Sequence, residues 1–168
     1  MDGILRALRL LTIMIWVGGL IFFAFVEAPT AFRVMGTTRQ FAQLIGDSIS
    51  ELNRMGHVCG FIFLVSTAMV WLRAWRRRRW LLVAQIVLVV LMIAATMFVQ
   101  AGILPAMERD RIAAGGDITA APATNPARLD FERLHPLSEK VEGSALFLGI
   151  ATILVMAAEP SGERRYSS

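Results

Sequence analysis

The sequence predicts an all-α integral membrane protein, a four-helix bundle with a short amphipathic helix on the outer side. Hydrophobic residues make up 56% of the 168 residues, and the mean hydropathy of +0.59 is high for a soluble domain. They gather into four apolar stretches, and a membrane-spanning helix needs about 20 such residues. We therefore expect a single membrane domain over residues 1–168, with spans at about 8–28, 55–74, 80–104 and 139–158.

The first apolar stretch, Leu10 to Val26, is expected to be an uncleaved span. Arg6 and Arg9 precede it as they would in a signal peptide, but the stretch is longer than the usual apolar region of such peptides. The residues after it, from Glu27 to Thr30, form a poor cleavage site.

The arginines predict the orientation. With four spans, both termini and the second-to-third connection lie on one side of the membrane. That short connection concentrates five arginines beside two membrane ends, whereas the basic residues of the other side are spread along longer loops. The positive-inside rule therefore places both termini in the cytoplasm, in a plasma (bacterial inner) membrane. The residues that carry this prediction are Arg73, Arg76, Arg77, Arg78 and Arg79, with Trp71, Trp75 and Trp80 as interfacial anchors.

The two outer connections differ in character. In the first, apolar residues at helical spacing between Phe41 and Met55 predict an amphipathic helix, which either lies on the interface or runs straight into the second span. Thr38 is its expected N-cap. The second connection begins at Pro105, and its small-residue middle is expected to be a mobile linker. Asn125 then caps a short helix, which Pro136 kinks or restarts.

Charge and motif content exclude several function classes. The net charge of +4 and the pI near 10.5 could suggest nucleic acid, but the basic residues alternate with apolar runs, so topology explains them better. One Cys excludes an intrachain disulfide and a CxxC centre. The sequence has no nucleophile–base arrangement, phosphate-binding loop or paired-carboxylate motif. We therefore expect no enzyme activity, no catalytic residue, no cofactor and no nucleic-acid partner, and a lipid bilayer as the environment.

Small residues inside the spans predict close helix packing, because packing drives helix association in lipid. Gly18 and Gly19 lie in the middle of the first span, and we expect them to face another helix. Gly56 and Gly60 form a GxxxG pattern in the second span. This pattern indicates packing within the bundle, with a homodimer as the alternative.

A few ionisable or metal-ligating residues are candidates for a function. Glu27 and Glu142 lie near the outer ends of the first and fourth spans, where a carboxylate is either interfacial or functional. His57 and His135 are predicted at the same membrane face, with Met55, Cys59 and Met107 as possible neighbours. Imidazole, thiolate and thioether suit copper, and two histidines could ligate haem. The simpler interpretation is that both histidines form ordinary interfacial hydrogen bonds, so no metal site is assigned.

Two segments resemble a known family. The first is W-V-G-G-L-I-F-F from Trp16 to Phe23, which continues to A-P-T-A-F from Ala28 to Phe32. The second is F-E-R-L-H-P-L-S, from Phe131 to Ser138. Together they resemble the transmembrane-protein-205-like family, whose bacterial members are filed as domain of unknown function 4149. The W-x-G-G part is also similar to copper-resistance D-type proteins, which makes copper or haem handling the alternative function.

The resemblance implies a compact four-span architecture and no established reaction. The residues that match the family motif, and to which the resemblance assigns a structural role, are Trp16, Gly18, Gly19, Phe23, Pro29, Phe32, Phe131, Leu134, His135 and Ser138. In this interpretation Pro29 ends the first helix, while His135 and Ser138 organise the start of the fourth.

Overall fold

A computed structural model describes residues 2–36, 38–73 and 79–159. All its regular elements are helices, which confirms the all-α prediction. In chain order they are α1 (Asp2–Phe22), the π-helical turn η1 (Phe23–Glu27), α2 (Ala28–Met35), α3 (Arg39–Arg73), α4 (Arg79–Phe98), the π-helical turn η3 (Val99–Ile103), α5 (Leu104–Ala113) and α6 (Pro126–Ala157).

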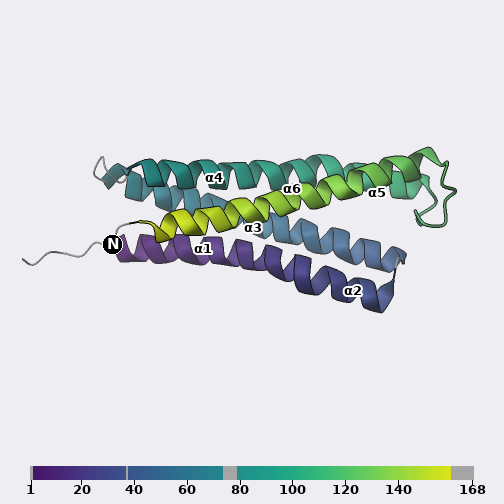
Figure 1. Ribbon diagram of the computed structural model, residues 1–168, viewed down its shortest axis with the longest axis horizontal. Helices are drawn as coiled ribbons and strands as arrows, with labels where there is room; N and C mark the ends of the chain where they lie inside the picture. Colours follow the sequence, from purple (N-terminus) through teal and green to yellow (C-terminus); the bar gives the residue numbers. More distant parts are fainter. Residues whose placement is uncertain (1, 37, 74–78, 160–168) are drawn as a thin grey trace, which may run out of the picture.

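The helices form four long columns that lie side by side (Figure 1). The column α1–η1–α2 packs against α3 and α6, while α4–η3–α5 packs against α3 and α6 from the other side. Neighbouring columns are antiparallel. We call the end with the start of α1 and the end of α6 the terminal end, and the end with the α2–α3 and α5–α6 connections the loop end.

In the part of the chain that the structure describes, four helical columns are long and apolar enough to cross a membrane: Gly3–Met35, Arg39–Leu72, Arg79–Ala113 and Pro126–Ala157. Large apolar side chains such as Phe61, Phe147 and Leu154 remain exposed along their outer sides. A soluble monomer rarely exposes apolar surface in this way, whereas lipid covers it without cost. By length and composition, these four helices agree with the all-α architecture that the sequence predicts.

Two prolines do not end their helices, contrary to expectation. Pro29 was expected to end the first helix and Pro105 to begin a loop, but the helical path continues to Met35 and to Ala113. A π-helical turn directly precedes each proline-containing segment. A proline lacks the N–H for the helical bond and crowds the carbonyl four residues earlier, and a wider turn can absorb that mismatch without breaking the column.

The amphipathic segment of the first connection is not a separate helix. It forms the first part of α3 and runs straight into the second span, the second of the two expected arrangements. The hydroxyl of Thr38 accepts the backbone N–H of Phe41 at 3.2 Å, which confirms the predicted N-cap. Gly36, with a φ of 62°, ends α2 in a conformation that few other residues adopt.

The fourth span also begins earlier than expected. Asn125 caps α6 by accepting the N–H of Ala127 at 2.9 Å, as predicted. However, Pro136 does not restart the helix, because α6 runs without interruption to Ala157. His135 therefore lies well inside α6, and its expected place at the start of the fourth helix is wrong.

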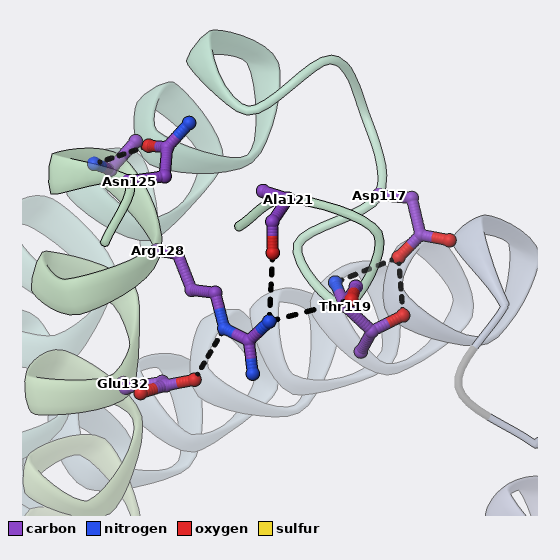
Figure 2. A network of polar contacts seen from close by, with 7 residues as sticks. Asp117, Thr119, Ala121, Asn125, Arg128 and Glu132 are labelled. Atoms are coloured by element: carbon purple, nitrogen blue, oxygen red, sulfur yellow. Dashed lines mark hydrogen bonds and ion pairs between the residues drawn. The ribbon is translucent and has the colours of Figure 1, made fainter. Parts of the chain in front are cut away.

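The connection before α6, expected to be a mobile linker, folds against the first turns of α6 (Figure 2). The guanidinium of Arg128 donates to the carbonyl of Ala121 at 2.8 Å and to the carboxylate of Glu132 at 2.8 Å. Asp117 accepts the amide of Thr119 at 2.9 Å and its hydroxyl at 2.7 Å. Hydrogen bonds hold this segment in place, and its small-residue composition alone does not predict them.

These bonds make the turn at Asp117 sensitive to acid. The hydroxyl and then the amide of Thr119 hold the pKa of Asp117 below its ordinary value, because both bonds favour the carboxylate. The turn is therefore fully stabilised above the ordinary aspartate pKa and loses that contribution as the pH falls through the lowered value. We expect the amide resonance of Thr119 to titrate in this acidic range by NMR. Asp117→Asn should abolish the titration, and an unchanged titration in that variant would contradict the assignment.

The centre of the bundle is built around Trp16, whose side chain is fully buried. Its indole lies over Gly56 and Gly60 of α3, and a Cβ added to Gly60 would lie 2.9 Å from the ring. The GxxxG pattern thus accommodates a side chain of the same chain, as expected for packing within the bundle. Gly149 makes a similar close approach, since an added Cβ would lie 2.5 Å from Val17.

The two adjacent glycines of α1 have different surroundings. A Cβ added to Gly19 would lie 2.6 Å from Leu52 and 3.3 Å from Met55, so this glycine does face α3. Gly18 is exposed, and a Cβ added to it would have no atom of a neighbouring helix within 4 Å. The expectation that Gly18 faces another helix is therefore wrong, because adjacent positions of a helix point about 100° apart.

Candidate functional site

The terminal end holds a buried ion pair that links three columns. Arg9 of α1 donates to Glu159, just after α6, at 2.6 Å, and both side chains are only 1% exposed. Gln85 of α4 donates to the same carboxylate oxygen at 2.8 Å and accepts a bond from Arg9. The Arg9 guanidinium also lies 5.6 Å from the centre of the Phe63 ring of α3.

This cluster balances its own charge. A buried carboxylate is tolerated when a guanidinium and further hydrogen bonds replace its lost hydration. Sequence reasoning treated Arg9 only as a topology signal and did not single out Glu159. The polar side chain of Gln85 inside the most apolar span was the one available indication. We interpret this cluster as a structural link between α1, α4 and the end of α6.

The loop end holds a second set of polar side chains, of which Asn53 and Thr96 are buried and Glu142 and His57 are partly buried. Asn53 of α3 donates its amide to Glu142 of α6 at 2.9 Å, across the bundle. His57 lies 3.0 Å from the hydroxyl of Thr96 on α4. Since that hydroxyl uses its single proton to reach the carbonyl of Met92, the Nε2 of His57 is assigned as the donor.

Several polar atoms at the loop end have no hydrogen-bond partner among the described residues. They are Asn53 Oδ1, Glu142 Oε2, Gln100 Oε1 and, nearer the α5–α6 connection, Arg111 Nη1, all inaccessible to water. Buried polar atoms normally have partners, so each exception needs a physical reason. A cavity of about 290 Å³ adjoins this region between α1–η1–α2 and α6, lined by Leu20, Ala24, Ala28, Glu139, Glu142, Gly143 and Leu146.

The structure does not bring the two histidines together. The Asn53–Glu142 bond sets the relative height of α3 and α6. From that level His57 lies one turn towards the terminal end and His135 two turns towards the loop end, a separation of about 16 Å along the bundle. The ring of His135 is exposed, stacks on Phe131 at 6.0 Å and faces the carboxylate of Glu139 at 3.4 Å.

The other metal candidates are also dispersed. Cys59 is buried in the apolar core, whereas the side chain of Met55 is 40% exposed. In residues 2–36, 38–73 and 79–159, no group of three His, Cys, Asp or Glu side chains is placed to hold a metal ion.

The motif residues lie mostly along α1 and α6, and their environments differ. Trp16 is central to the core, and Phe32 packs edge-on against Phe41 at 5.7 Å, joining α2 to α3. The hydroxyl of Ser138 donates to the carbonyl of His135 at 2.7 Å. Phe23 and Leu134 are partly buried, and Pro29 is exposed. These contacts are structural in kind.

Two further predictions concern charged residues near the ends of the bundle. Glu27 lies partly buried in η1 and forms no ion pair with a described residue.

Arg79 lies 5.1 Å from the centre of the Trp71 ring, where α3 ends and α4 begins. Arg73 is the last residue of α3, and Trp80 is 67% exposed. Arg76, Arg77, Arg78 and Trp75 lie outside the described residues.

Comparison with known proteins gives one match. Residues 11–112 match a family model described as a domain of unknown function, DUF4149. The match covers α1 to α5, including Trp16, the paired glycines of α3 and the Asn53, His57 and Thr96 side chains. Neither the curated proteins nor the solved structures contain a match.

Proposed function

Because the chain belongs to the DUF4149 family, for which no activity is defined, we propose its function from the polar groups that the bundle encloses. The proposal is a non-enzymatic integral membrane protein that acts by binding at the loop end, around Asn53 and Glu142. Ionisable groups inside a membrane bundle usually mark ligand, ion or proton sites.

One contrast carries this proposal. The carboxylate of Glu159 at the terminal end is balanced by the guanidinium of Arg9 and accepts a further bond from Gln85, and the unmatched atom of that cluster is a donor, Arg9 Nε. Glu142 at the loop end has one amide partner, and two acceptors of this pair, Glu142 Oε2 and Asn53 Oδ1, remain unmatched. It also adjoins a cavity. A carboxylate with unmatched acceptors around it and no balancing cation is better suited to binding a proton or a cation than one that is already ion-paired.

Binding can be tested through thermal stability in detergent. Wild type and Glu142→Gln would each be melted over a range of pH, and with sodium or tetraethylammonium. We expect at least one of these variables to shift the Tm of wild type and to leave that of Glu142→Gln unchanged. Equal responses of the two proteins to every variable would overturn the proposal.

Copper or haem handling is the alternative from a different class, and the same preparation tests it. Metal content and the optical spectrum would be measured for wild type, His57→Ala and His135→Ala. Stoichiometric copper or a Soret band that is lost in both variants would replace the proposed function with this alternative. The 16 Å offset between the rings along the bundle argues against a shared ligand.

We also propose that the protein resides in the bacterial inner membrane with both termini and the arginine-rich connection in the cytoplasm. The support is the density of arginines between α3 and α4. In a Cys59-free variant, single cysteines in the α5–α6 connection should react with an impermeant reagent in intact cells, while cysteines beside Arg73 should not. The reverse pattern would overturn the orientation.

The surrounding lipid is the proposed partner of the exposed apolar surface. A homodimer is a separate hypothesis, and it would need a surface other than Gly56 and Gly60, because Trp16 of the same chain covers both. Crosslinking in native membranes would detect such a dimer.

A further inference from the structure

We propose that Asn53 and Glu142 form a proton-binding site, in which Glu142 is a neutral carboxylic acid at neutral pH. This inference rests on the proposed function and names the proton as the ligand of the loop-end site. In the resulting pair, Asn53 Nδ2 donates to Glu142 Oε1, and the added proton on Glu142 Oε2 donates to Asn53 Oδ1.

The count of donors and acceptors leads to this assignment. The one bond between the two side chains, 2.9 Å long, uses an Asn53 N–H and one Glu142 oxygen. The remaining oxygens of both groups are buried and have no donor among the described residues. A carboxamide and a carboxylic acid have complementary edges, each with one donor and one acceptor. A single proton on Glu142 Oε2 therefore supplies the donor that both unmatched atoms lack, whereas an ionised Glu142 would leave two buried acceptors without a donor.

The charged surroundings support the neutral form. Among the described residues, no Lys, Arg or His forms an ion pair with Glu142, in contrast to Glu159 with Arg9. Of the titratable residues on the packed columns, Glu139 lines the same cavity, Glu27 directly precedes the cavity residue Ala28, and His57 lies one turn of α3 beyond Asn53 with its ring bonded to Thr96. The neighbouring polar residue of η3, Gln100, is uncharged. A buried carboxylate without a cation is strongly disfavoured relative to its protonated form.

The cavity offers the proton a route. Its lining includes both Glu139 and Glu142, which are three positions apart and therefore on one face of α6. The side chain of Glu139 is 68% exposed, so it can exchange protons with water. Loss of the proton from Glu142 would break the bond to Asn53 Oδ1 and leave a charge in the interior, which would weaken the contact between α3 and α6.

Infrared difference spectroscopy of the protein in lipid nanodiscs tests the protonation state directly. At pH 7 we expect the carbonyl band of a neutral carboxylic acid in wild type and its loss in Glu142→Gln. The band should shift in Asn53→Leu, which removes the partner, and should persist in Glu139→Gln, which alters the neighbouring exposed acid. Absence of the band in wild type, or its persistence in Glu142→Gln, would overturn the inference.

A second measurement does not depend on spectral assignment. A folded state that holds one proton more than the unfolded state loses stability as the pH rises, by up to about tenfold in the folding equilibrium per pH unit. Glutamine presents the same donor and acceptor edge as the neutral acid, so Glu142→Gln should fold and should show a smaller pH slope than wild type. Equal slopes would contradict the proton site. If Glu142 proves ionised while sodium or tetraethylammonium still stabilises wild type alone, this inference fails and the proposed binding function stands.

Discussion

Glu159→Leu is expected to lower the free energy of unfolding by about 3–5 kcal/mol, the largest effect predicted for a single side chain in this protein. The substitution leaves the buried guanidinium of Arg9 without its carboxylate, which lies 2.6 Å away in the native structure. It also removes the acceptor of Gln85. Reversible unfolding in mixed detergent would give the difference from wild type.

Two controls separate the ion pair from general effects of the substitution. Glu51→Leu removes the exposed partner of Arg54, where both side chains are mostly accessible, and should change stability by less than about 1 kcal/mol. The double variant Arg9→Met/Glu159→Leu removes both charges and should recover much of the lost stability. If the single and double variants are equally unstable, lost packing rather than an unpaired charge explains the effect.

Gly56→Leu is expected to have the second-largest effect, because the new side chain would occupy the space of the Trp16 indole. Overpacking a well-packed core typically costs about 1–3 kcal/mol, and the rigid ring has no alternative position in a fully buried site. A lower Tm in detergent would show the loss.

Gly18→Leu is the matched control for this substitution. It adds the same side chain at a glycine that no other group approaches, on a surface where lipid would cover it. Its Tm should remain near that of wild type. Equal destabilisation by both substitutions would mean that helix propensity, rather than contact with Trp16, sets the cost of replacing a glycine.

The spacing of apolar and capping residues determined most of the secondary structure. Apolar stretches that are long enough to cross a membrane, alone or with a flanking turn, predict spanning helices whatever their neighbours, since each backbone must satisfy its own hydrogen bonds in lipid. Local capping was equally readable, as Thr38 and Asn125 show. The prediction that Pro29 and Pro105 end their helices was wrong, because the effect of a proline depends on whether the adjacent helical turn can widen. The turns η1 and η3 are widened in this way.

Tertiary structure decided which polar residues meet. Arg9, Gln85 and Glu159 are far apart in the chain, as are Asn53 and Glu142, and no local pattern pairs them. Their proximity depends on the register of the packed columns, which close packing of Trp16 against two glycines helps to fix. The sequence alone therefore determined that the chain forms four helices long and apolar enough to cross a membrane, whereas the packed bundle decided that one acid meets a guanidinium and the other an amide. That difference in partner is the physical reason for the different roles assigned to Glu159 and Glu142.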